Sequence, residues 1–103
     1  MAPRAVEVPQ VVGVLGLARA AGEAGAALPG RAWVAARIER RVHWRLDRPR
    51  WLLALDAALI VDLPHGDFRV LQRGDALELP AGIDLSLQPI ADAVALLWHD
   101  ESP

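Results

Sequence analysis

The 103-residue chain contains no cysteine, lysine, tyrosine, threonine or asparagine, and its only serines are Ser86 and Ser102. Without cysteine it can form no disulfide, thiolate metal site or cysteine nucleophile, so we expect a reducing compartment, the cytoplasm. The other absences exclude lysine Schiff bases, tyrosine acids and threonine nucleophiles. No nucleophile motif surrounds Ser86, so a serine hydrolase is not expected. Acid–base chemistry is left to three histidines and the carboxylates.

Long apolar runs are also absent. The longest, residues 11–18, is too short to span a bilayer and ends at Arg19, so we expect no membrane association. This run resembles the hydrophobic part of a secretory signal, but Glu7 and Pro9 lie just before it, where a secretory signal is not expected to carry an acidic residue or a proline. A hydrophobic content of 53% in 103 residues fits one compact domain.

The charged residues are unevenly distributed. Residues 31–50 hold seven arginines against Glu39 and Asp47, whereas residues 51–103 hold two arginines against nine acids. Three interpretations are open. The arginines could pair with acids on neighbouring strands or lie in solvent, they could hold a small anion, or, with Trp33, Trp44 and Trp51, they could bind single-stranded nucleic acid. A pI of about 5.8 disfavours the last interpretation.

The first third of the chain predicts a helix followed by a loop. Pro9 and apolar residues at helical spacing (Val11, Val12, Val14, Leu15 and Ala18) predict a helix over residues 9–22. Residues 24–31 read as a loop, because Pro29-Gly30 is a strong turn pair. We therefore predict an N-terminal segment, residues 1–31, and a β-barrel, residues 32–103, within one domain.

From residue 32 the pattern changes to that of strands. Residues 32–47 alternate between apolar and polar side chains, which predicts one or two strands before Pro49. The apolar face comprises Val34, Ala36, Ile38, Val42, Trp44 and Leu46, and the polar face comprises Arg37, Glu39, Arg41, His43, Arg45 and Asp47. Residues 51–63 are apolar on both faces apart from Asp56 and Asp62, which predicts a central strand covered by the N-terminal segment or by a second subunit. Short strands over 68–72, 76–79, 85–90 and 93–99 follow, separated by turns at 64–67, 73–75, 80–84 and 91–92. The sequence thus predicts an all-β barrel or sandwich.

The second half resembles a cupin, a small double-stranded jelly-roll barrel. The second cupin motif runs glycine, five residues, proline, one residue, glycine, two residues, histidine, three residues, asparagine. Gly74, Pro80 and Gly82 match it, but Leu85 occupies the histidine position and Pro89 the asparagine position. The turn residues are present, whereas the metal ligand is not. Gly74 and Gly82 are expected to supply positive φ at tight turns.

The first cupin motif can be laid on residues 43–57, with His43 at the first histidine, Arg45 at the second and Arg50 at the glutamate. If this alignment holds, Arg45 and Arg50 point into the barrel. One imidazole is too few ligands for a catalytic metal, and a guanidinium repels a divalent ion, so we expect no metal and no cofactor. Two guanidiniums could instead clamp a carboxylate or phosphate.

The main hypothesis is a metal-free, non-catalytic, cupin-like homodimer that binds a small, possibly anionic ligand through His43, Arg45, Arg50 and Leu85. A broad apolar face and the resemblance both favour the dimer. One alternative is a cupin-type isomerase or oxygenase that uses His43 with a carboxylate such as Asp56 or Glu78. Another is single-stranded nucleic-acid binding through residues 31–50.

Overall fold

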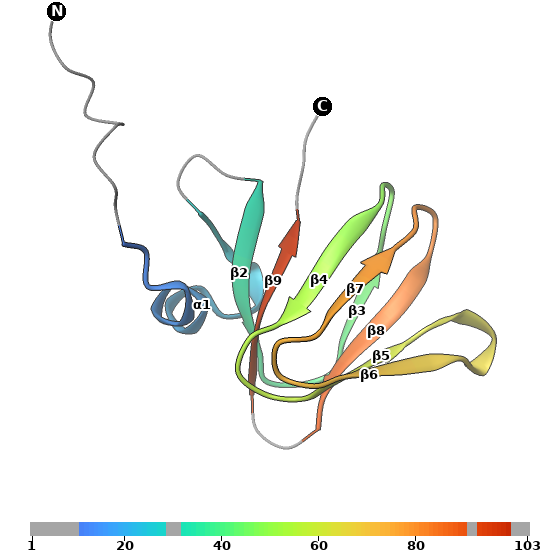
Figure 1. The fold of residues 1–103 in the computed structure, drawn as a ribbon. Coiled ribbons are helices and arrows are strands. Elements are labelled where there is room, and N and C mark those ends of the chain that lie inside the picture. The colour runs from blue at the N-terminus through green and yellow to red at the C-terminus, as the bar shows by residue number, and fades with distance from the viewer. Residues whose placement is uncertain (1–10, 29–31, 91–92, 100–103) are drawn as a thin grey trace, which may run out of the picture.

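Two antiparallel sheets face each other and enclose the core, with one short helix on the outside of the larger sheet (Figure 1). The computed structural model describes residues 11–28, 32–90 and 93–99. The five-stranded sheet has the order β1 (Ala26–Ala27), β2 (Trp33–Ile38), β9 (Val94–His99), β4 (Arg50–Ala54), β7 (Ala76–Leu79). The four-stranded sheet has the order β3 (Val42–Arg45), β8 (Asp84–Pro89), β5 (Leu59–Asp62), β6 (Phe68–Leu71). The predicted all-β jelly-roll class with a short N-terminal helix is confirmed.

The core lies between the sheets and is filled by aliphatic side chains. The alternation predicted for residues 32–47 is confirmed, with a break at residues 39–41 that separates β2 from β3. The buried core comprises Ala36, Ile38, Leu46, Leu52, Ala54, Leu59, Val61, Leu71, Leu79, Leu85, Leu87, Val94 and Leu96. Because Leu85 and Leu87 occupy the interior, the lumen of the barrel is packed.

The single central strand predicted over residues 51–63 is wrong. This run forms two strands, β4 and β5, which belong to different sheets. Asp56 fixes the corner between them, because its Oδ1 accepts a hydrogen bond from the backbone N–H of Ala95 at 2.8 Å. No glycine or proline marks this corner, so the local pattern gave no sign of it.

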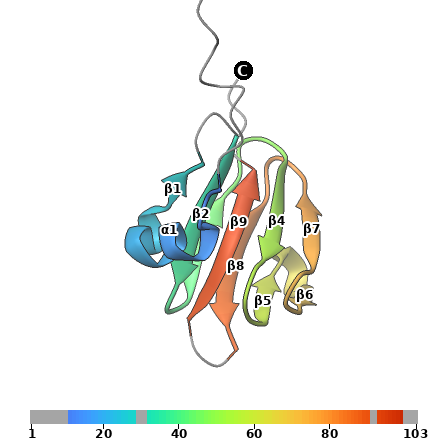
Figure 2. The same cartoon turned by 60° about the vertical axis from the view of Figure 1, so that its left-hand side comes forward.

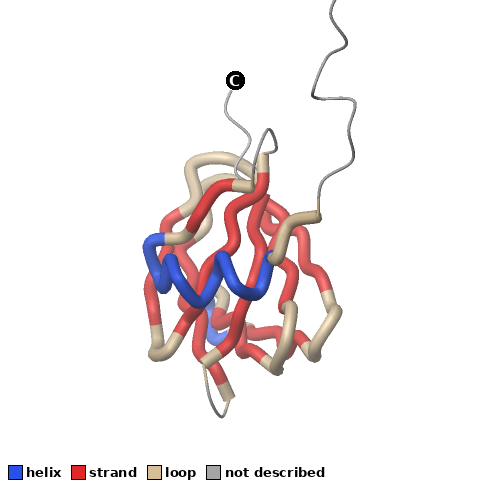
Figure 3. Tube along the Cα trace, turned by 90° about the vertical axis from the view of Figure 1, so that its left-hand side faces the viewer, coloured by secondary structure: helices blue, strands red, loops and turns tan. Residues whose placement is uncertain are grey.

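The helix α1 (Val14–Ala21) is shorter than predicted and uses a different face. Residues 11–13 lie outside it, and residues 9 and 10 lie outside the described part of the chain. Val14, Leu17 and Ala18 pack against the outer face of the five-stranded sheet, whereas Leu15 is exposed. Figures 2 and 3 show the helix crossing this face over β2 and β9. The N-terminal segment therefore covers part of the apolar face, including Leu55.

The segment after the helix is also more regular than the predicted loop over residues 24–31. A short 3-10 helix, η2 (Gly22–Ala24), leads into β1, which pairs with β2 through Ala26↔Ala35 and Ala27↔Val34. Residues 29–31 and the predicted turn at 91–92 lie outside the described residues. None of the described helices has the length and hydropathy needed to cross a membrane.

Three tight turns use left-handed backbone conformations. Gly74 has φ of 89° and Gly82 has φ of 77°, so the expectation of positive φ at both glycines is confirmed. At the tip of the β5–β6 hairpin the short helix η3 (Pro64–Gly66) places His65 at φ 65°, a conformation that non-glycine residues rarely adopt. The sequence pattern predicts a turn here but not this conformation.

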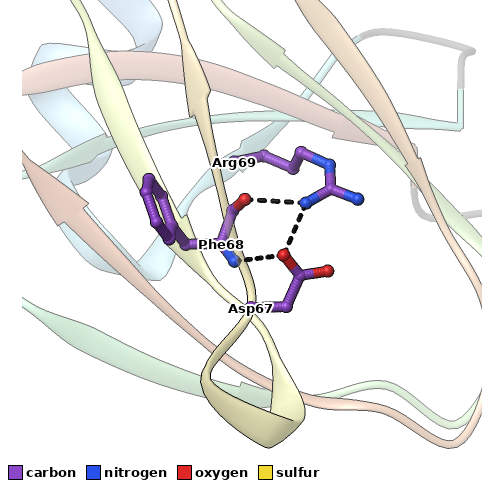
Figure 4. Close-up of polar contacts among 3 residues, drawn as sticks. All are labelled: Asp67, Phe68 and Arg69. Carbon is purple, nitrogen blue, oxygen red and sulfur yellow. Dashed lines mark hydrogen bonds and ion pairs between the residues drawn. The ribbon is translucent and has the colours of Figure 1, made fainter.

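Asp67 follows η3 where the turn of this hairpin enters β6 (Figure 4). Its Oδ1 accepts hydrogen bonds from the backbone N–H of Phe68 at 2.9 Å and from Nη1 of Arg69 at 2.8 Å. The Arg69 hydrogen bond, followed by the bond from the Phe68 backbone, lowers the pKa of the Asp67 carboxyl from its ordinary value of 3.8. The Asp67 side chain therefore favours the hairpin in its ionised form.

Candidate ligand-binding site

A cavity of about 280 Å³ lies where the end of β3, the start of β4 and the end of β9 come together. It is lined by His43, Trp44, Arg45, Leu46, Arg50 and Trp98. The indole rings of Trp44 and Trp98 come from opposite sheets and pack edge to face, with centroids 4.9 Å apart and an angle of 68° between the planes. Both rings also pack against the buried core, so they form an apolar wall between the core and the cavity.

Three cationic or titratable side chains line the same cavity. The Arg50 side chain is 16% exposed, its Nη2 lies 3.6 Å from Asp47 Oδ1, and its Nη1 donates to the His99 carbonyl at 3.4 Å. Arg45 is 68% exposed and its Nη1 binds Asp84 Oδ2 at 2.8 Å. Arg50 is therefore the guanidinium best shielded from water, where its attraction for an anion is screened least.

The structure brings together three of the four site residues predicted from the sequence. His43, Arg45 and Arg50 line one cavity, although His43 and Arg45 are exposed residues on the polar side of β3. Leu85 does not line it. This side chain is 2% exposed and lies in the core, on β8 opposite Trp44. Sequence reasoning missed Trp98, because its proximity to Trp44 depends on how the two sheets face each other.

The two carboxylates named for the enzyme alternative, Asp56 and Glu78, do not lie beside His43 in this cavity. Asp56 is engaged by the Ala95 N–H and by Arg37, whose Nη1 lies 3.5 Å from Asp56 Oδ2. Glu78 is on β7 of the other sheet, opposite Trp51. The carboxylate next to His43 is Asp84, with Oδ1 3.6 Å from Nε2. Within the described residues, no three histidine, aspartate or glutamate side chains gather as a metal site would require.

The arginines of residues 31–50 are paired with acids. All six that the structure describes lie within 4 Å of a carboxylate: Arg37–Asp56, Arg40–Glu23, Arg41–Asp62, Arg45–Asp84, Arg48–Asp47 and Arg50–Asp47. Three of these acids come from the acidic second half, so folding places the two charge-biased regions against each other. All six thus lie near acids, but only Arg45–Asp84 joins two neighbouring strands, β3 and β8, as the sequence interpretation expects. This pairing leaves less positive potential for a nucleic-acid backbone.

A second cavity of similar size lies beside η2 and is lined by Gly22, Glu23, Arg37, Glu39 and Arg40. No large apolar side chain lines it, and two of its arginines are engaged with carboxylates. Ligand sites combine apolar walls with a few polar groups, so the cavity beside Trp44 and Trp98 is the better candidate.

Comparison with solved structures identifies the architecture. The protein NMB1881 from Neisseria meningitidis superposes with a TM-score of 0.73 at 12% identity, over 90% of this chain and 100% of that one. A cupin-2 domain protein from Shewanella frigidimarina superposes with a TM-score of 0.59 at 13% identity, over 74% of this chain and 76% of that one. The chain has a cupin fold.

A third structural match is hydroquinone 1,2-dioxygenase from Sphingomonas sp. TTNP3, solved with 4-hydroxybenzoate bound. Its TM-score is 0.64 at 21% identity, over 87% of this chain and 73% of that one. No protein-family model matches the chain, and no curated protein matches it. At these identities the structural similarity concerns the fold, and function must be argued from the cavity itself.

Proposed function

We propose that this cupin-fold chain binds a small organic anion in the cavity beside Trp44 and Trp98, without a metal and without turning the ligand over. The observation that carries the proposal is the Arg50 guanidinium, which is largely shielded from water and lines a cavity with an apolar wall. A ligand carboxylate beside such a guanidinium gains charge-assisted hydrogen bonds, and the indole rings favour an apolar body.

The test is a titration of the purified protein with 4-hydroxybenzoate, followed by tryptophan fluorescence and by calorimetry. This molecule is a carboxylate with an apolar ring, and it is the one present in the dioxygenase structure. Arg50→Gln should weaken binding by about tenfold or more, the effect of losing one charge-assisted hydrogen bond. Arg69→Gln is the matched control, because Arg69 lies in the β5–β6 hairpin away from the cavity. Equal affinity in the two variants, or no binding of any carboxylate by the wild type, would overturn the proposal.

The non-catalytic, metal-free part of the proposal is tested separately. Its support is the residue set: Leu85 and Arg45 stand where cupin ligands are expected, and the carboxylate near His43 is held by Arg45. We expect native mass spectrometry of protein purified without chelator to show no divalent ion, and His43→Ala to keep most of the carboxylate affinity. One divalent ion per subunit would instead favour the cupin-type enzyme.

We also propose that the chain forms a homodimer in the cytoplasm. The cytoplasmic location rests on the absence of cysteine. The dimer rests on the part of the five-stranded sheet's outer face that α1 leaves open, where Trp51 is 44% exposed. Trp51→Glu should convert a dimer into a monomer in light scattering. Phe68→Glu, a change at a 55% exposed aromatic on the other sheet, should leave the dimer intact. A monomeric wild type, or dissociation caused by Phe68→Glu alone, would contradict this assignment.

A further inference from the structure

The candidate cavity runs along the open edge of a β-strand. Four of its six lining residues, His43 to Leu46, are consecutive. The first three belong to β3, and successive side chains of a strand point to opposite faces, so a cavity that touches all three reaches the backbone edge between the faces. β3 is an outer strand of the four-stranded sheet, with β8 on one side only.

The hydrogen-bond pattern shows which backbone groups of β3 point to this edge. Leu46 directs both of its groups towards β8: its N–H donates to the Ile83 carbonyl at 2.9 Å and its carbonyl accepts from the Gly82 N–H at 2.7 Å. In an antiparallel pair the residues alternate between those bonded to the partner strand and those bonded to the other side. Trp44 therefore bonds to β8, whereas the N–H and carbonyl groups of His43 and Arg45 point away from it.

Neighbouring ladders agree with this assignment. The N–H of Ile90 donates to the Ala58 carbonyl at 3.4 Å. By the same alternation, the backbone groups of Ser86 and Gln88 point towards β5, whereas those of Leu85 and Leu87 point towards β3. These are the register partners of Trp44 and Val42. Within the described residues, no strand pairs with the outer edge of β3. The strand edge beside the cavity thus carries main-chain donors and acceptors that no described strand pairs with, next to Arg50 and the indole wall.

We propose that the cavity binds N-acylated amino acids: the ligand amide pairs with the exposed main chain of His43 and Arg45, its carboxylate contacts Arg50, and its side chain lies against Trp44 and Trp98. A simple carboxylate would leave the strand edge without partners, whereas an amide beside a carboxylate satisfies both features. The cavity of about 280 Å³ corresponds to roughly nine water molecules of liquid, similar to the size of N-acetylalanine. This inference rests on the proposed anion site and specifies its ligand class.

The first experiment compares two ligands that differ at one atom. N-acetyl-L-alanine and O-acetyl-L-lactate have the same shape and the same carboxylate, but the lactate derivative has an ester oxygen in place of the amide N–H. We expect the lactate derivative to bind about tenfold more weakly, because a backbone carbonyl of β3 then loses its donor. Equal affinities would overturn the amide inference while leaving the anion site standing. If neither compound nor 4-hydroxybenzoate binds, the proposed function itself fails.

A pair of variants tests the protein side of the same hydrogen bonds. Arg45→Ala and Arg45→Pro both remove the Arg45 side chain, but the proline variant also removes the backbone N–H that points to the open edge. Proline is tolerated on a strand edge, and equal melting temperatures would confirm that both variants fold. Arg45→Pro should bind N-acetylalanine about tenfold more weakly than Arg45→Ala. Equal affinities of two equally folded variants would contradict the proposal.

The length of the ligand distinguishes two possible sources, a free N-acylamino acid and the carboxy-terminal unit of a peptide. N-acetyl-Ala-Ala and longer acetylated alanine peptides extend the amide chain along the edge of β3. Affinity that is kept or increased with length would identify the carboxy-terminal unit of a peptide as the ligand. Affinity for N-acetylalanine that is lost with length would identify a free N-acylamino acid. Both results support the proposed ligand class, because each requires the amide and the carboxylate together.

Discussion

Replacing Leu85 with alanine tests whether this position serves the fold. Its side chain is 2% exposed and packs in the core between the sheets, on β8 opposite Trp44. Truncating a fully buried leucine removes its transfer free energy and leaves a cavity, which together destabilise a protein by about 3–5 kcal/mol. Since a small domain has a total stability of about 5–15 kcal/mol, Leu85→Ala should fold but be markedly weakened.

The assay is urea unfolding followed by tryptophan fluorescence, because Trp44 and Trp98 lie against the same core. With a urea dependence of about 1–3 kcal/mol per molar for a small protein, a loss of 3 kcal/mol lowers the unfolding midpoint by about 1–3 M. The control is Phe68→Ala, which removes a larger side chain that is 55% exposed and should destabilise by about 1 kcal/mol or less. If the two variants lose equal stability, the placement of Leu85 in a packed interior is refuted.

Two further predictions concern the turns. Gly25→Ala should be more destabilising than Gly74→Ala. Both glycines have positive φ, at a cost of about 1–2 kcal/mol for alanine, but a Cβ on Gly25 would also lie 2.5 Å from Val34 Cγ1 and 2.8 Å from Trp98 Cη2, whereas nothing lies within 4 Å at Gly74. Equal losses in thermal unfolding would show that the side chains around Gly25 move aside freely. Asp67→Asn should lower the melting temperature at pH 7, and the difference from the wild type should vanish as the pH falls below 3.8. The sign follows from the lowered pKa: stabilisation by the carboxylate is complete above its unfolded-state pKa and is lost as it is protonated in the folded state. A difference that is unchanged in acid would exclude the ionised carboxylate as its cause.

The parts of the fold that local chemistry determines could be predicted from the sequence. The sequence predicts the strands from residue 68 onward to within a residue or two, because turns such as those at Gly74 and Gly82 separate short apolar runs. The corner at Asp56 could not be predicted, because it depends on a hydrogen bond from Ala95, 39 residues away. The buried face of α1 also differs from the predicted face, and the reason is similar. Its apolar residues occur on more than one side, and only the position of the sheet selects Val14, Leu17 and Ala18.

The site was partly predictable for comparable reasons. The family resemblance drew attention to Arg50, and the structure places this residue at the cavity. The same resemblance drew attention to Leu85, which is in the core. The edge-to-face contact of Trp44 and Trp98 joins strands 54 residues apart in sequence, and the open edge of β3 follows from strand order. No local pattern contains information about either feature.

The order of the strands also has a consequence for how the protein is made. β9 lies between β2 and β4 in the five-stranded sheet, although it follows both by about 40 residues or more and is the last of the described strands. During synthesis β2 and β4 leave the ribosome long before the strand that joins them, so the sheet cannot assemble progressively. Contacts as distant as Trp33 with His99 favour slow folding, in milliseconds to seconds, as in other β-barrels. Until β9 is available, the edges of β2 and β4 are exposed to other chains, and this interval is when the protein is most prone to aggregate.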